Sequence, residues 1–234
     1  MSPLALVTGA AHRLGKSFAL TLARLGYDIV LHYHSAEEAA LKTKAEIESL
    51  SRSVILARAD LTDPAQIQSL ISKIESLDVL VNSAAFMPSG NVDSLALENW
   101  DTSLDLNLRA PFLLVQECAK KMHNDGLIVN ITDVGAQKTW SRYPSYTVSK
   151  AALESLTKIL ARALAPKIRV NAIAPGFVLQ SDIVLPEEWE RLIGRIPLKR
   201  PASSEEITSA LEFLLKNEYI TGQTIVVDGG YSLV

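Results

Sequence analysis

The sequence predicts an α/β protein built on a doubly wound parallel sheet. Short runs rich in Val, Ile and Leu alternate along the chain with longer segments of helical periodicity. Most of these runs are apolar at successive positions, as expected when helices cover both faces of a sheet. We therefore expect about seven strands, with helices on both faces.

The elements follow from the order of these runs. The predicted strands are Leu4–Val7, Asp28–Leu31, Val54–Ala57, Val79–Val81, Leu127–Ile131, Arg169–Ile173 and Thr224–Val227. The predicted helices lie near residues 14–25, 36–50, 64–76, 98–122, 146–165 and 204–216. Helix starts are marked by Asp63 before Pro64, and by Ser203 and Ser204 before two glutamates. No repeat or Pro/Gly-rich linker divides the chain, so we expect residues 1–234 to form one domain.

Composition narrows the class of protein. With 48% hydrophobic residues and a net charge of −3, the chain can form a large core and has no general attraction to nucleic acid or anionic membranes. The single cysteine, Cys118, lies in an apolar stretch and is expected to be a buried, inert thiol. The first residues lack the pattern of a signal peptide, and the longest uncharged run, 79–92, is too short to span a bilayer. We expect a soluble, cytoplasmic protein without a metal site.

The first strand runs into a glycine-rich turn that opens a helix. Gly9 and Gly15 would let the backbone approach a pyrophosphate, and the helix N-terminus, beginning near Leu14, would supply free N–H groups. Arg13 stands where a middle glycine often occurs, and its guanidinium could meet a phosphate or a planar substrate. This order predicts a Rossmann-type nucleotide site, although a plain tight turn and a surface arginine are the simpler alternatives.

The end of the second strand bears on the choice of nucleotide. It carries His32, Tyr33, His34 and Ser35, and no acid that would bind the 2′-hydroxyl of NAD. A carboxylate would repel a 2′-phosphate, whereas these histidines, Ser35 and Arg13 could donate hydrogen bonds to one. NADP(H) is therefore favoured over NAD(H), although both histidines could be ordinary strand-end residues.

Polar and small residues also follow the third and fourth strands. Asp60 and Leu61 come after the third, and Asn82, Ser83 and Ala84 end or follow the fourth. Ligands of doubly wound sheets bind at the carboxyl ends of the strands, so we expect these residues to contact the cofactor.

A possible general acid lies further along the chain. Tyr146 and Lys150 are four residues apart, which places them on one face of a helix. An ammonium near a phenol lowers its pKa and brings the tyrosine within range of proton transfer. The spacing alone is also found on ordinary helix surfaces. Asp133, thirteen residues before Tyr146, is the most discriminating residue near this pair.

Over its full length the sequence resembles the short-chain dehydrogenase/reductase family. The matching segments are Thr8–Gly15, Asp60–Leu61, Asn82–Ala85, Asn107 with Ala110–Pro111, Tyr146 with Lys150, Arg169–Asn171, Ala174–Gly176, Thr221–Gly222 and Asp228–Gly230. More narrowly, the chain resembles pteridine reductases and dihydromonapterin reductases. That likeness rests on Arg13, Leu31–His34, Phe86, Asp133, Trp189 and Asp228–Leu233.

The resemblance implies roles for these residues. Asn107, a serine, Tyr146 and Lys150 would form the catalytic group, and Asp133 occupies the place of that serine. The implied cofactor is NADPH, with Lys150 at the nicotinamide ribose and the backbone of Pro175 and Gly176 at the carboxamide. Related proteins form tetramers through helices like 98–122 and 146–165, which here are apolar around much of their circumference, so a homotetramer is expected.

Asp133 changes the expected substrate. An ionised carboxylate cannot donate a hydrogen bond to a ketone oxygen and would repel its developing charge. A pterin instead presents N–H donors, and the nitrogen of its reduced C=N bond needs a proton. The carboxylate would also raise the pKa of Tyr146 and keep its phenol protonated. Thr132 faces the opposite side of the strand and Ser145 lies at the helix entry, so neither easily replaces the serine.

We therefore expect an NADPH-dependent reductase of dihydropterins or dihydrofolate, in which Tyr146 supplies the proton with help from Asp133. Phe86 would stack on the flat substrate, and Arg13 and Trp189 would line its pocket, although Phe86 could be a core residue and Trp189 a helix anchor. One alternative is a carbonyl or 3-oxoacyl reductase. Another, from a different class, is an NADP(H)-binding regulatory protein without turnover.

Overall fold

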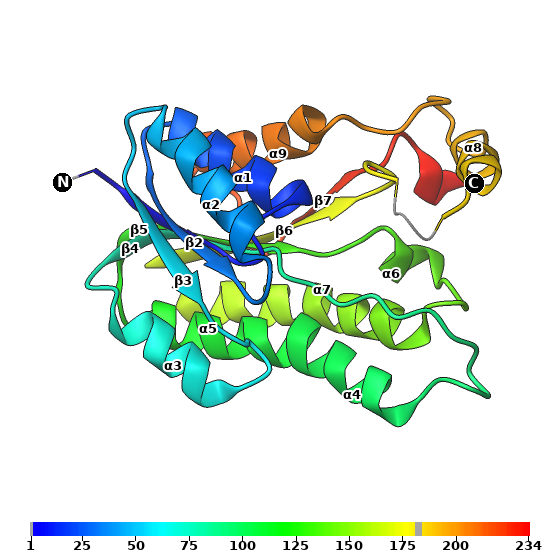
Figure 1. The fold of residues 1–234 in the computed structure, drawn as a ribbon, viewed down its shortest axis with the longest axis horizontal. Helices are drawn as coiled ribbons and strands as arrows, with labels where there is room; N and C mark the ends of the chain where they lie inside the picture. Colours follow the sequence, from blue (N-terminus) through cyan, green and yellow to red (C-terminus); the bar gives the residue numbers. More distant parts are fainter. Residues whose placement is uncertain (1, 181–183) are drawn as a thin grey trace.

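A seven-stranded parallel sheet runs through the protein (Figure 1). The computed structural model describes residues 2–180 and 184–234. The strand order is β3-β2-β1-β4-β5-β6-β7, and every neighbouring pair is parallel. The strands are β1 (Leu4–Val7), β2 (Asp28–Tyr33), β3 (Val54–Arg58), β4 (Leu77–Asn82), β5 (Met122–Ile131), β6 (Ile168–Pro175) and β7 (Thr224–Val227). All seven predicted strands are confirmed, and β5 begins at Met122 rather than at Leu127.

Helices cover both faces of this sheet, as predicted (Figure 1). On one face lie α1 (Arg13–Arg24), α2 (Glu37–Glu48) and α9 (Ser204–Lys216). On the other lie α3 (Pro64–Ser72), α4 (Leu97–Leu104), α5 (Ala110–Cys118) and α7 (Pro144–Leu164). The chain crosses from one side of β1 to the other between β3 and β4. The carboxyl ends of β1 and β4 therefore flank the position where doubly wound sheets bind ligands.

The apolar strands are explained by two separate cores. In β1, Ala5 and Val7 pack with α1 and α9, whereas Leu6 between them packs with α3 and α5. In β5, Val129 belongs to the same core as Ala5 and Val7, and Ile128 to the same core as Leu6. Alternate side chains of a strand face opposite sides of the sheet, so both sets must be apolar when both faces are covered.

The predicted helix over 98–122 is wrong in its middle and at its end. It consists of α4, a π-helical segment at Asp105–Arg109, and α5, and the chain then turns into β5. Pro111 has no N–H to donate to the carbonyl of Asn107, the α-helical acceptor four residues earlier, so the regular ladder cannot continue there. This interruption places Asn107, a predicted catalytic residue, on a wider turn of backbone.

Two short helices at the carboxyl edge of the sheet were not predicted. They are α6 (Gly135–Lys138) and α8 (Pro186–Ile193). The start of α8 carries ordinary signals, with Pro186 at its first turn and two glutamates after it. Elsewhere, Cys118 is buried as expected, and burial raises the pKa of its thiol to about 12. No helix within residues 2–180 and 184–234 has the length and apolar character needed to cross a bilayer.

The predicted start of α9 is confirmed in detail, and its stability can be tested. The Ser203 hydroxyl accepts a hydrogen bond from the Glu206 N–H, and the Glu206 carboxylate accepts one from the Ser203 N–H. Replacing Ser203 with alanine removes the first of these bonds, so we expect Ser203→Ala to lower the free energy of unfolding by about 1 kcal/mol. Urea denaturation measures this loss. The neighbouring Ser204→Ala is the control, and an equal loss in both variants would contradict the assignment.

Candidate active site

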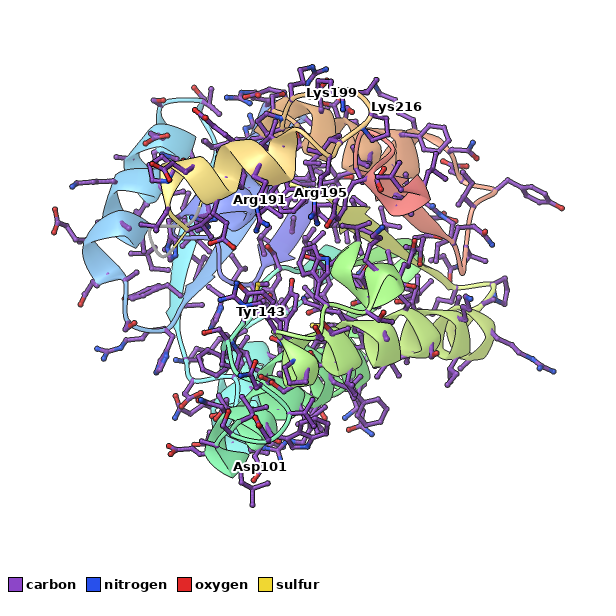
Figure 2. All side chains as sticks on the ribbon, turned by 90° about the vertical axis from the view of Figure 1, so that its right-hand side faces the viewer. Asp101, Tyr143, Arg191, Arg195, Lys199 and Lys216 are labelled. Atoms are coloured by element: carbon purple, nitrogen blue, oxygen red, sulfur yellow. The ribbon has the colours of Figure 1, made fainter. Side chains whose placement is uncertain are left out.

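The loops at the carboxyl ends of the strands enclose a cavity of about 1350 Å³. Its wall combines the glycine-rich turn after β1, the ends of β2, β5 and β6, the first turns of α7, and α8. Figure 2 looks toward this end of the molecule, with Arg191 and Arg195 beneath α8 and Tyr143 across from them. Most of the predicted site residues therefore meet in one place.

At the base of the cavity, Tyr146 and Asp133 are directly joined. The Tyr146 hydroxyl donates a hydrogen bond of 2.8 Å to Asp133 Oδ2, and the Gly135 N–H donates one of 2.6 Å to Oδ1. Tyr146 comes from α7 and is 6% exposed, and Asp133 lies just beyond β5. The spacing of thirteen residues thus corresponds to a direct contact.

Burial and mutual repulsion govern the ionisation of this pair. Burial raises the pKa of Asp133 to about 6, although its hydrogen bonds from Gly135 and Tyr146 and the nearby Lys150 act in the opposite direction. Burial, followed by the charge of Asp133, raises the pKa of Tyr146 well above 10. At neutral pH the phenol therefore keeps its proton, as the expected effect of the carboxylate requires.

Lys150 is buried beside this pair without bonding to the phenol oxygen. Its Nζ donates a hydrogen bond of 2.7 Å to the carbonyl of Ile131 and lies 5.7 Å from the centre of the Tyr146 ring. Burial lowers the pKa of Lys150 to about 8, while Asp133 acts to raise it. The expected lowering of the tyrosine pKa by this lysine is not found, because burial and Asp133 both raise the pKa of Tyr146.

Asn107 supports the cavity from behind its wall. Its side chain forms two hydrogen bonds with the backbone of Phe86. Asn107 Oδ1 accepts from the Phe86 N–H, and Nδ2 donates to the Phe86 carbonyl, each at 2.8 Å. It also donates to the Ser149 hydroxyl at 3.0 Å, and Ser149 donates to the carbonyl of Tyr146. Asn107 thus ties the segment that presents Phe86 to the first turns of α7.

Neither hydroxyl considered from the sequence replaces the missing serine. The Thr132 hydroxyl is buried and donates to the carbonyl of Ile173 at 3.2 Å. The Ser145 hydroxyl is buried against Ser103 Oγ at 3.0 Å. The residue that Tyr146 contacts at this position is therefore the carboxylate of Asp133.

The glycine-rich turn has the tight geometry expected of a phosphate cradle. Gly9 has φ +64°, and a Cβ built on Gly15 would lie 2.1 Å from the carbonyl oxygen of Gly9. Only glycines allow the turn to close this tightly before α1. No carboxylate directly follows β2 in the sequence, where His34 and Ser35 line the cavity, and the nearest one is Asp60, whose Oδ2 lies 4.0 Å from His34 Nε2. These features fit a dinucleotide that carries a 2′-phosphate.

His32 has a different role from the one expected. Its ring is 2% exposed, Nδ1 accepts a hydrogen bond from the Gly9 N–H, and Nε2 lies 3.1 Å from the carbonyl of Ala59. Burial lowers the pKa of His32 to about 4, so the ring is neutral and Nε2 carries its proton. Both nitrogens are engaged by backbone, so His32 holds the glycine turn instead of donating to a 2′-phosphate.

The remaining predicted contacts divide between the cavity wall and the interior. The predicted residues on the wall are Gly9, Arg13, Leu14, Gly15, Tyr33, His34, Ser35, Asp60, Leu61, Ser83, Ala84, Phe86, Pro175, Gly176 and Trp189. Asn82 is a correction, because it is buried and donates to Asn130 Oδ1 instead of lining the cavity. It joins β4 to β5 beneath the site, where a polar side chain needs a partner.

Comparison with known proteins places this site in a family. Residues 9–232 match a family described as enoyl-(acyl carrier protein) reductase. The 3-oxoacyl-[acyl-carrier-protein] reductase FabG of Staphylococcus aureus is 35% identical over 98% of this chain and 98% of its own length. The chain belongs to the short-chain dehydrogenase/reductase family.

Solved structures show the same fold in reductases of different substrates. FolM alternative dihydrofolate reductase 1 from Brucella canis, complexed with NADP, is 34% identical, with a TM-score of 0.93 over 99% of this chain and 94% of that one. The angucycline C-6 ketoreductase LanV with bound NADP is 29% identical, with a TM-score of 0.94 over 99% and 96%. Membership of the short-chain dehydrogenase/reductase family therefore leaves the substrate to be argued from the site.

Several residues of this reductase site were missed from the sequence. Trp140 stacks on Phe177 at 5.9 Å between ring centres, and Phe177 packs edge-on against Trp189 and Tyr231. These aromatic residues come from four separate segments, so no sequence spacing could have joined them. Arg191 was also missed. Trp189 and Leu192, three residues apart after Pro186, have the spacing of one helical face, and this spacing could have indicated the helix that carries Arg191.

The buried state of His32 predicts a pH-dependent contribution to stability. Its pKa is about 4 in the folded protein and about 6.5 when unfolded, so below pH 6.5 the unfolded chain binds more protons. The contribution of His32 to the free energy of unfolding is fully present above pH 6.5 and is lost as the pH falls toward 4. His32→Asn keeps an acceptor for the Gly9 N–H and does not titrate. We expect the free energy of unfolding of wild type to exceed that of His32→Asn by roughly 2 kcal/mol less at pH 5 than at pH 7.5.

Urea denaturation at the two pH values measures this difference. The exposed neighbour provides the control, because His34→Asn removes a histidine whose side chain is 66% exposed. An advantage over His32→Asn that is equal at pH 5 and pH 7.5 would show that the ring is not held neutral.

Proposed function

We propose that this chain is an NADPH-dependent reductase of pteridines, acting on dihydropterin or dihydrofolate-type substrates. The observation that carries the proposal is the 2.8 Å hydrogen bond between Tyr146 and the half-buried carboxylate of Asp133. It puts an acceptor of hydrogen bonds where reduction of a ketone needs a donor. It also keeps a proton on the phenol, where reduction of a C=N bond needs one.

The cofactor of this short-chain oxidoreductase is NADP(H), as in the related structures that contain NADP. When bound, NADPH supplies the hydride. The glycine turn and the N-terminus of α1 would receive its pyrophosphate, and His34 and Ser35 its 2′-phosphate. Lys150, held by the carbonyl of Ile131, would bind the nicotinamide ribose.

The proton would come from the pair at the base of the cavity. Tyr146 Oη holds the proton and is oriented by Asp133 Oδ2, because the Gly135 N–H fixes the other carboxylate oxygen. Transfer from Tyr146 Oη to the ring nitrogen completes the reduction of the C=N bond. Lys150 remains positively charged below its pKa of about 8 and offsets the negative charge left on the pair.

The substrate would be held by contacts suited to a flat ring with polar edges. Phe86 lines the cavity and is fixed through its backbone by Asn107, so it can stack on the ring. Asp133 can also accept from ring N–H or amino groups. Arg13, whose guanidinium donates to the carbonyl of Leu179 at 3.1 Å, and Trp189 complete the wall.

A second candidate function is reduction of 3-oxoacyl thioesters, favoured by the likeness to the Staphylococcus aureus enzyme. Against it stands Asp133, which would face the keto oxygen. NADPH oxidation measured with dihydrobiopterin, dihydromonapterin, dihydrofolate, a simple ketone and a 3-oxoacyl thioester separates the two. We expect turnover of the pteridines. Turnover of the thioester alone would replace the proposal, and tight NADPH binding with no turnover would favour a regulatory role.

The assembly proposed with this function is a homotetramer. Leu97, Phe112, Val148 and Ile159 are exposed on α4, α5 and α7, with exposed fractions of 72%, 42%, 46% and 63%. Such a row of apolar side chains on neighbouring helices suits a contact between copies of the chain.

Exchange of Asp133 should reverse the preference for substrate. Asp133→Ser replaces an acceptor with a hydroxyl that can donate to a ketone oxygen. We expect kcat/KM for dihydropterins to fall by about 100-fold and turnover of a 3-oxoacyl thioester to rise. Both rates are followed by NADPH oxidation, with the Kd for NADPH as the control for an intact cofactor site. Unchanged pterin turnover in this variant would remove the basis of the proposal.

Tyr146→Phe tests the source of the proton separately. The variant keeps the ring and loses only the hydroxyl that donates to Asp133. We expect kcat for dihydropterins to drop by about 100-fold or more, with the Kd for NADPH unchanged. Full activity of this variant would show that another group supplies the proton.

A further inference from the structure

The mouth of the cavity is built from one face of α8 and the turn that follows it. Glu188, Arg191, Leu192 and Arg195 all line the cavity, at spacings of three, four and seven residues. These are the spacings of a single helical face. The exposed side chain of Arg191 and that of Arg195 lie beneath α8, across the opening from Tyr143 (Figure 2).

The charges at this mouth do not balance. Glu188 Oε1 is shared between Arg142, at 3.4 Å, and Arg191, at 3.9 Å. One carboxylate thus faces two guanidinium groups. Arg195 forms no ion pair with any carboxylate in the described part of the chain. The described side chains leave a surplus of positive charge at the rim.

This surplus lies at the exposed rim of the cavity, whereas the reacting groups lie deeper in it. Tyr146 is buried and Asp133 half-buried at the base, whereas 64% of the Arg191 side chain and 72% of the Arg142 side chain are exposed. The phosphate-binding features, namely the glycine turn, His34 and Ser35, belong to β1 and β2 on another part of the wall. A substituent leaving a ring bound at the base would therefore pass beneath α8.

We propose that Arg191 and Arg195 form a carboxylate-binding subsite for the acidic tail of a reduced folate. This inference rests on the proposed function and specifies its substrate class: a pteridine with an anionic tail, in preference to a neutral dihydropterin. Guanidinium groups bind carboxylates through paired N–H donors, and an exposed rim makes the interaction moderate and sensitive to salt. Glu188 competes with the tail for Arg191.

The experiment compares dihydrofolate with dihydrobiopterin, which carries an uncharged side chain. In the double variant R191Q/R195Q at saturating NADPH, we expect KM for dihydrofolate to rise about tenfold, while kcat/KM for dihydrobiopterin stays within about twofold. E188Q should lower KM for dihydrofolate. Added salt should raise that KM in wild type and much less in the double variant.

The control is K216Q, which removes an exposed positive charge from α9, away from the cavity mouth (Figure 2). Equal losses with both pteridines, or a matching loss of NADPH affinity, would overturn the subsite, because the arginines would then serve the fold or the cofactor. A rise in KM with K216Q as large as that in the double variant would reduce the effect to net charge and also overturn it.

Failure of the proposed function gives a different result. If no pteridine is reduced, that function is wrong, and the subsite is then decided by binding alone. Dihydrofolate is titrated into the NADP⁺ complex of each variant and followed by tryptophan quenching. Weaker binding only in the double variant supports the subsite, and equal Kd values in wild type and double variant overturn it.

Discussion

The hydrogen bond between Tyr146 and Asp133 is the constraint on which the rest of this site depends. A carboxylate enclosed by protein is costly to ionise, and here its pKa is about 6 even with a backbone N–H and a phenol donating to it. Maintaining it requires the turn at Gly135, the first turns of α7 and a buried lysine to meet at one point. The fold supplies this meeting point at the carboxyl ends of β5 and β6, which are adjacent in the sheet.

That bond also changes what the tyrosine and lysine of the family can do. Lys150 is anchored to the carbonyl of Ile131, and its Nζ lies 5.7 Å from the centre of the Tyr146 ring. Asp133 contacts the phenol and raises its pKa. The result is a donor that stays protonated, next to an acceptor that stays largely ionised near neutral pH. Such a pair suits a substrate whose reduced bond ends in nitrogen.

Much of the fold could be predicted because the strands obey one strong rule, continuous apolar runs between helical segments. The interruption at Asp105–Arg109 escaped that rule, since it changes the backbone hydrogen bonds over one turn while the chain stays helical on both sides. In the site, the closeness of Asp133 to Tyr146 was expected from the family resemblance, in which Asp133 occupies the place of the catalytic serine. The bonds of His32 and Asn82 could not be foreseen, because their partners, Gly9, Ala59 and Asn130, come from other strands and loops.

The two ends of the cavity discriminate between substrates at different levels. The cationic mouth would accept any anionic tail, whether the carboxylates of a folate or the phosphates of an acyl carrier. It therefore cannot distinguish pteridines from oxoacyl thioesters. The base can, because Asp133 would repel a keto oxygen yet accept hydrogen bonds from a heterocycle. In the proposed reaction, one half-buried carboxylate would thus decide the class of substrate, while Arg191 and Arg195 would decide the choice among pteridines.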